Sequence, residues 1–316
     1  MSDAVSPVAT IGTAAGTHRS GLIFGGLSYA LWGVLPLYFL LLAPSGAFEI
    51  VAWRVLFSLV FCVLIITVTR TWTVLGRALR QRRLVLTMGL AGVFIFINWQ
   101  TYVIAATTGH VVEAALGYFI NPIVTVLLGV FVLREHLRRL QWVAITISFL
   151  AVVVLAVGYG SLPWISLILA FSFGLYGLIK KRVGPSVDAV TGLTLETAWL
   201  APVAVIQLVV VSGISGLTFG TVSPWHTAGL LAAGIITAVP LLLFAAAARR
   251  LPLTVLGLIQ FVAPVLQFLV GVFILNEAMP LERWLGFGLV WVALIILTVD
   301  MVASGRTPRR STLEPA

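Results

Sequence analysis

The sequence predicts an all-α membrane protein with ten transmembrane helices, arranged as two five-helix repeats of opposite orientation. Three observations predict this fold: long apolar stretches recur, basic residues fall on one side of the resulting spans, and a segment of the first half recurs in the second. Of 316 residues, 60% are hydrophobic and 9% are charged, too few polar residues to cover a soluble domain. The apolar content also excludes a disordered chain, and the single Cys62 excludes a disulfide scaffold.

Ten apolar stretches are long enough to cross the bilayer, which takes roughly 20 residues of helix. They are predicted at 21–42, 48–69, 84–106, 110–133, 140–157, 162–179, 190–211, 226–248, 253–275 and 281–302. Their apolar runs are continuous rather than alternating, which favours helices over strands. We expect residues 1–19 to form a flexible tail without a separate signal peptide, and residues 303–316 to form a second tail.

The basic residues predict the orientation of the spans. Of the 19 Lys and Arg residues, 17 lie before the first span, after an even-numbered span or after the last span. The two exceptions are Arg54 and Arg283. The positive-inside rule therefore places both termini in the cytoplasm of a multi-pass inner (plasma) membrane protein. The net charge of +9 is then a topology signal and a source of contact with anionic lipids. No basic face with stacking aromatics lies outside the membrane, so we expect no nucleic-acid binding.

An internal repeat predicts how the ten spans are organised. The segment at 122–142, PIVTVLLGVFVLREHLRRLQW, aligns without a gap with the segment at 264–284, PVLQFLVGVFILNEAMPLERW. Among the coinciding residues are Glu135 and Glu277, which the alignment places at corresponding helix ends. Each half then holds five spans, and an odd number inserts the halves in opposite directions. We predict a first repeat at 20–157 and a second at 158–302, an organisation typical of secondary transporters with a site near the midplane.

Five stretches carry a resemblance to a known family. They are WGVLPLY (32–38), AFEIVAWRVLFS (47–58), ALGYFINPIVTVLLGVFVLRE (115–135), GSLPWISLILAFSFGLYGLIKK (160–181) and LETAWLAPVA (195–204). In these stretches the chain resembles the RarD (chloramphenicol-sensitive protein) branch of the EamA group, within the drug/metabolite transporter superfamily. The resemblance runs from about residue 20 to 302. It implies ten helices, two EamA repeats, an inner-membrane location and a permease that is usually assumed to be an exporter.

Polar side chains inside the spans are candidates for substrate binding, because hydrocarbon disfavours them unless they face a cavity or a partner. Arg54 lies about two turns into the second span. One interpretation is a positive centre for an anionic group of the substrate or for a carboxylate. The alternative is a fixed ion pair with Glu49 or Glu113, or snorkelling to the outer head groups. Glu49 and Arg54 are five positions apart and do not share a helix face.

The fourth span contributes a second set of candidates, Glu113, Tyr118 and Asn121. Gly117, Tyr118 and Asn121 share one broad helical face, and the following Pro122 frees a backbone carbonyl one turn earlier. We interpret this face as substrate lining. The alternative is ordinary helix packing with a proline kink and an asparagine hydrogen bond.

The third, seventh and ninth spans contribute the remaining candidates. Asn98, Trp99 and Tyr102 form a polar and aromatic stretch that could stack on a flat substrate, or that could anchor the helix or pack in the core. Glu196 is either a proton carrier or a structural carboxyl bonded to Trp199 or to a backbone carbonyl. Gln260 mirrors the face of the fourth span in the second repeat.

These features together predict a secondary transporter, acting as an exporter, that moves a small organic metabolite or drug-like compound by alternating access. The alternative is a membrane sensor or assembly partner without flux of its own. We expect no enzyme activity, no cofactor and no metal, because the four His residues and one Cys form no ligand spacing and no P-loop is present. The expected partners are a small-molecule substrate and the lipid bilayer, with a coupling proton and a homodimer as hypotheses.

Overall fold

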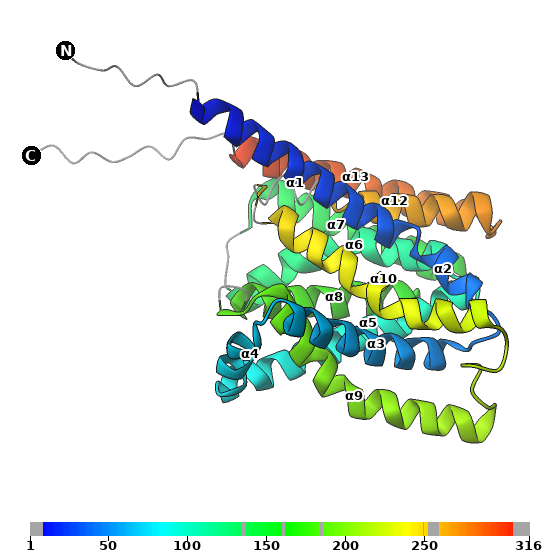
Figure 1. Cartoon of the computed structure of the whole chain (residues 1–316). Helices are drawn as coiled ribbons and strands as arrows, with labels where there is room; N and C mark the ends of the chain where they lie inside the picture. Colours follow the sequence, from blue (N-terminus) through cyan, green and yellow to red (C-terminus); the bar gives the residue numbers. More distant parts are fainter. Residues whose placement is uncertain are drawn as a thin grey trace, which may run out of the picture.

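A computed structural model of the chain describes residues 9–133, 137–159, 162–183, 186–248, 250–251 and 259–305. In these ranges the protein is helical and contains no strand, which confirms the predicted all-α class (Figure 1). The helices are α1 (Ala9–Gly33), α2 (Leu35–Leu41), α3 (Ala47–Val68), α4 (Trp72–Leu79), α5 (Arg82–Thr107), α6 (Val111–Leu133), α7 (Arg139–Tyr159), α8 (Trp164–Val183), α9 (Ala189–Ile214), α10 (Pro224–Ala248), α12 (Val262–Leu269), the π-helical turn η2 (Val270–Ile274) and α13 (Leu281–Gly305).

Most of the helices have the length and composition of membrane spans. Within the described residues, seven helices are long and apolar enough to cross a bilayer, and α1 with α2 adds an eighth if the bent pair is one span. The segments Trp164–Lys180 and Val262–Ile274 are shorter apolar helices. Each of the ten predicted stretches therefore contains helix, and the protein is a multi-pass membrane protein.

The first predicted span differs from the expectation, because it is bent rather than continuous. Helix α1 ends at Gly33, and α2 begins at Leu35 at an angle of 42°. Pro36 lies in the first turn of α2, where its missing N–H is tolerated. In a continuous helix the same proline would clash with the carbonyl one turn earlier, so Gly33 and Pro36 together favour the break.

The first predicted tail also differs from the expectation. Helix α1 begins at Ala9, so residues 9–19 of the predicted flexible tail are helical, consistent with their alanine content. Residues 1–8 lie outside the described ranges, as do 306–316 of the other predicted tail. The loop after the second span contains the short helix α4, which buries Leu75 and Ala78.

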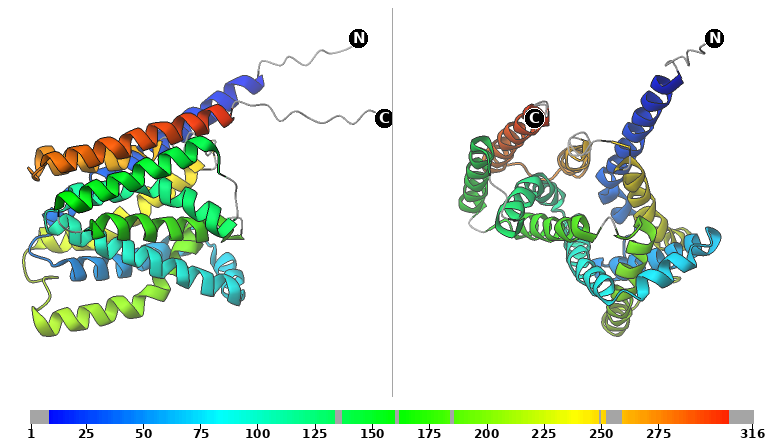
Figure 2. Two further views of the ribbon diagram at one scale, coloured as in Figure 1. Left: turned by 180° about the vertical axis from the view of Figure 1, so that it is seen from behind. Right: turned by 90° about the vertical axis from the view of Figure 1, so that its left-hand side faces the viewer.

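The helices pack as a bundle around α3, α5, α6, α8 and α10. Helix α3 contacts α9, α10 and α5, while α6 and α5 both contact α8. Helix α1 packs on α10 and α12, and α7 and α13 form a pair at one edge of the bundle (Figure 2). The start of α1 and the end of α13 lie at the same end of the molecule.

Glycines allow the tightest helix contacts. A Cβ atom on Gly234 of α10 would collide with the backbone carbonyl of Phe57 on α3. A Cβ atom on Gly117 of α6 would lie 2.7 Å from the carbonyl oxygen of Ser166 on α8.

The outer surface is apolar, with exposed side chains such as Val60 and Ile206, as expected for helices that face lipid.

Candidate functional site

Arg54 is buried in the centre of the bundle. It lies on α3 beside Val51 and Val55, which are also buried, and its own side chain is 4% exposed. Its Nε donates a hydrogen bond of 2.8 Å to Thr237 Oγ1 on α10. The guanidinium lies 4.5 Å from the ring centroid of Trp99, a cation–π distance, while its Nη1 is buried without a hydrogen-bond partner.

The two carboxylates that sequence reasoning offered as partners of Arg54 are bound elsewhere. Glu49 accepts hydrogen bonds from the backbone N–H groups of Thr218 (2.9 Å) and Phe219 (3.2 Å), in the connection between α9 and α10. Glu113 accepts from the backbone N–H of Ile165 at the start of α8, at 3.2 Å. Among the described residues, Arg54 forms no ion pair with either acid.

A polar network from three helices lies in the same central region. Tyr118 on α6 donates from its hydroxyl to Asn98 Oδ1 on α5 at 3.0 Å. Asn98 in turn donates from Nδ2 to the carbonyl oxygen of Leu169 (3.2 Å) and to Ser172 Oγ (3.3 Å), both on α8. Because Asn98 is 2% exposed, these bonds replace the water that it cannot reach.

Aromatic rings connect the surroundings of Arg54 with a second charged site. Phe39, Tyr102, Tyr118, Phe173 and Tyr176 form a series in which successive ring centroids lie 6.0, 5.6, 6.0 and 6.0 Å apart. The first three of these contacts are edge-to-face, a favourable geometry for ring pairs. The series draws its rings from α2, α5, α6 and α8.

The second charged site is an ion pair between α8 and α9. Lys180 Nζ lies 2.7 Å from Glu196 Oε1, and the Tyr176 hydroxyl donates to Glu196 Oε2 at 3.3 Å. The Glu196 side chain is 1% exposed, whereas that of Lys180 is 27% exposed. Trp199, which was one of the alternative partners for Glu196, instead donates to the carbonyl oxygen of Val85.

A third carboxylate, which sequence reasoning did not assign to any role at this position, holds the start of α6. Glu277 accepts from the backbone N–H groups of Val111 at 2.6 Å and Val112 at 2.9 Å. These two N–H groups have no partner within their own helix, so the carboxylate caps the helix. Its repeat counterpart Glu135 lies outside the described residues.

The structure thus brings together five of the nine predicted site residues, namely Arg54, Asn98, Trp99, Tyr102 and Tyr118. The other four lie elsewhere. Glu113 lies in the first turn of α6 and is bound to the start of α8, and Glu196 lies in the ion pair with Lys180. The Asn121 amide oxygen is buried, without a partner, beside Gly174.

Gln260 lies in the turn before α12, and a different glutamine reaches the site. The side chain of Gln267 lies beside Tyr102 and donates to the carbonyl oxygen of Trp32 at 3.2 Å. Thr237, Lys180 and Tyr176 were missed by sequence reasoning. Of these, only Lys180 carries a charge that marks it in the sequence, and its position beside other basic residues suggested a loop.

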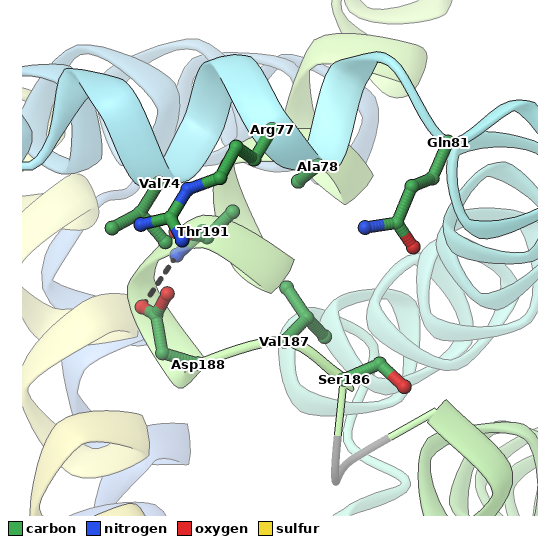
Figure 3. Close-up of a pocket in the computed structure, with 8 residues that line it drawn as sticks. All are labelled: Val74, Arg77, Ala78, Gln81, Ser186, Val187, Asp188 and Thr191. Carbon is green, nitrogen blue, oxygen red and sulfur yellow. Dashed lines mark hydrogen bonds between the residues drawn. The ribbon is translucent and has the colours of Figure 1, made fainter.

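A surface hollow of about 440 Å³ lies between α4 and the start of α9 (Figure 3). Within it, Asp188 caps α9 by accepting from the backbone N–H groups of Val190 (3.1 Å) and Thr191 (3.0 Å). This carboxylate therefore has a structural role. In the described part of the chain, no group of three or more His, Cys, Asp or Glu residues could hold a metal ion.

Comparisons with known proteins bear on the whole chain. A profile described as the EamA-like transporter family matches residues 19–157. Protein RarD of Streptomyces exfoliatus is 48% identical over 93% of this chain and 92% of its own length. The uncharacterized transporter YojE of Bacillus subtilis is 40% identical over 90% of this chain and 95% of its own length. Protein RarD of Escherichia coli is 38% identical over 91% of this chain and 97% of its own length.

A solved structure shares the fold at low sequence similarity. This crystal structure of another protein has a TM-score of 0.58 and 19% identity, and the match covers 91% of this chain and 99% of that one. Because the family profile and three relatives agree with the resemblance seen in the motifs, the chain belongs to the EamA-like transporter family, among relatives that are named RarD.

Proposed function

We propose that this membrane protein is a secondary transporter that moves a small organic compound across the inner membrane by alternating access. The observation that carries the proposal is the central cluster of Arg54, Asn98, Trp99, Tyr102 and Tyr118, which contains buried polar atoms without partners. Such groups inside a bundle are costly and are usually retained for a ligand or an ion pathway. We expect the compound to bind there and to leave the cell.

The helix contacts support two repeats of opposite orientation, at 20–157 and 158–302. The repeat alignment equates α6 with α12 and α7 with α13. Counting back from these pairs in chain order equates α1 with α8, α3 with α9 and α5 with α10. If a two-fold axis in the membrane plane relates the two repeats, a contact between two helices should recur between their two counterparts. When each helix is replaced by its counterpart, three contacting pairs stay the same, namely α3–α9, α7–α13 and α6–α12. The contact between α1 and α10 becomes that between α8 and α5, and the contact between α3 and α10 becomes that between α9 and α5. All of these contacts occur, as an inverted repeat demands.

Both termini are proposed to lie in the cytoplasm. The basic loops predict this orientation, and the start of α1 and the end of α13 lie at the same end of the bundle, which supports it. On this assignment Lys180 and Glu196 lie toward the cytoplasmic end, and Glu49, Glu113 and Glu277 lie toward the outer end.

The carboxylates of the two ends suggest how each end closes. At the outer end, Glu49, Glu113 and Glu277 each hold a backbone segment of another helix or connection. At the cytoplasmic end, the ion pair between Lys180 and Glu196 joins α8 to α9. Opening one end requires its bonds to break, and protonation of Glu196 would release Lys180, which makes this pair the candidate for coupling to a proton gradient.

The test is an uptake screen with purified protein in liposomes, with and without an imposed pH gradient. The panel contains labelled anionic, neutral and cationic organic compounds, and empty liposomes serve as the control. The proposal predicts that at least one compound accumulates only with protein, and that the pH gradient changes its uptake. A protein that binds compounds but never moves any of them across the membrane would contradict the proposal and favour the sensor alternative.

A further inference from the structure

Arg54 has no counter-charge of its own. The ion pairs within the described residues are Arg138 with Asp300 and Lys180 with Glu196, and Arg54 belongs to neither. An arginine keeps its charge in proteins, so it cannot escape the cost of burial by losing its proton. A buried charge without a counter-charge is strongly unfavourable, and the hydrogen bond to Thr237 and the attraction of the Trp99 ring compensate for only part of this cost. The position therefore favours an anion supplied from outside the chain.

Two buried hydrogen-bond donors lie in this region. One is Arg54 Nη1, which has no partner, and the other is the hydroxyl of Tyr102, which is 3% exposed and interacts with the side chain of Gln267. Tyr102 lies within electrostatic range of the guanidinium and in ring contact with Phe39, which also lies under Arg54 at 5.7 Å. A carboxylate has two oxygens, and it could accept from the guanidinium with one and from the hydroxyl with the other.

The charge and the surroundings narrow the class of anion. Arg54 is the one cation of this cluster, since Lys180 is occupied by Glu196, so a single negative charge matches the site better than a phosphate dianion. The rings of Tyr118 and Phe173 continue the site on one side, which suits an apolar or aromatic tail. The side chain of Gln267 interacts with Tyr102, and its buried amide oxygen could also accept from a donor on that tail.

We propose that the site binds an organic monocarboxylate, with the carboxylate on Arg54 and Tyr102 and the tail along the aromatic series. The ligand class rests on the proposed function only in that the bound compound is taken to be the transported one. Binding itself is independent of transport, and it can be measured on the purified protein in detergent.

The experiment compares three carboxylates with their neutral amides: hippurate with hippuramide, benzoate with benzamide, and hexanoate with hexanamide. Binding is followed by the intrinsic fluorescence of the protein, with sodium chloride as a control for a small inorganic anion. We expect at least one carboxylate to bind more than about tenfold tighter than its amide. Arg54→Gln should abolish this preference, whereas Arg82→Gln, at an exposed arginine, should leave it unchanged.

Tyr102→Phe provides a test that does not depend on removing a charge. It deletes only a hydroxyl whose interaction is with the neighbouring Gln267 side chain, so the variant should lose little stability relative to the wild type. It should nevertheless bind the preferred carboxylate about tenfold more weakly. A merely structural tyrosine would show no such loss at unchanged stability.

The proposal is overturned if none of the three pairs shows a preference that depends on Arg54, or if chloride alone reproduces the fluorescence change. These failures differ from a failure of the proposed function. Uptake of neutral compounds without any preference for carboxylates would overturn the ligand class and leave transport intact. Carboxylate binding that depends on Arg54, without uptake of any compound, would support the ligand class and overturn the proposal of transport.

Discussion

Replacement of Gly234 by alanine tests whether the contact between α3 and α10 holds Arg54 in place. The added Cβ would collide with the backbone carbonyl of Phe57 and lie 3.0 Å from the backbone nitrogen of Ser58. No side-chain rotation can relieve a collision with backbone, so the two helices must separate, by about 1 Å if ordinary contact distances are restored. Thr237 lies one turn further along α10, and its hydrogen bond to Arg54 is 2.8 Å long. The same separation would bring it beyond hydrogen-bonding distance.

The expected cost follows from these two effects. Overpacking of a tight contact costs about 1–3 kcal/mol. Loss of a hydrogen bond to a charged group costs about 1.5–3 kcal/mol. The better helix propensity of alanine returns at most about 1 kcal/mol. We therefore expect Gly234→Ala to lower the free energy of unfolding by roughly 2–5 kcal/mol and to weaken carboxylate binding, because Arg54 loses its lateral support.

Unfolding by sodium dodecyl sulfate in mixed micelles, followed by the fluorescence of the ten tryptophans, measures the stability. Gly177→Ala on α8 is the matched control, because nothing lies within 4 Å of its added Cβ and it should not destabilise the protein. Thr237→Val removes the hydrogen bond while leaving the contact between the helices intact. If Gly234→Ala were as stable as the wild type and bound carboxylates equally well, the packing argument would be refuted.

Further predictions concern the charged groups at the two ends of the bundle. Glu277→Gln should cost about 1–2 kcal/mol in the same unfolding assay, because Val111 and Val112 lose a charged acceptor for their N–H groups; an unchanged midpoint would show that the cap is dispensable. Glu196→Gln should destabilise less than Lys180→Met, since Lys180 can turn its ammonium toward water whereas Glu196 cannot. The double variant should recover part of the loss, and strictly additive effects would contradict a coupled pair.

The sequence predicted the helices well because crossing a membrane imposes a length and an apolar composition that are visible locally. The bend between α1 and α2 was missed, although Gly33 and Pro36 supply the local cause. The sequence does not predict the early start of α1 at Ala9, because this segment contains both alanine, which favours helix, and glycine, which disfavours it.

Contacts between distant helices could not be predicted from one chain. Thr237 looks like any threonine in an apolar helix, and its role depends on Arg54, 183 positions away. The sequence predicts a loop at Lys180, because two further basic residues follow it. In the structure α8 continues to Val183, and the Lys180 side chain reaches Glu196. The sequence identifies Glu277 only as a position of the internal repeat, because no neighbouring residue in the sequence indicates that it binds the start of α6.

The central claim is that a polar site in the middle of the bundle is reached from each side of the membrane in turn. Ser172 lies in that site, bonded to Asn98, and the single Cys62 can be replaced by serine to give a background without cysteine. In that background, Ser172→Cys is treated in oriented vesicles with a membrane-impermeant sulfonate thiol reagent from one side or the other. Val60→Cys, on the lipid-facing surface, is the control. We predict that the reagent modifies position 172 from either side, more slowly when a bound carboxylate is present; modification from one side only, or from neither, would contradict the claim.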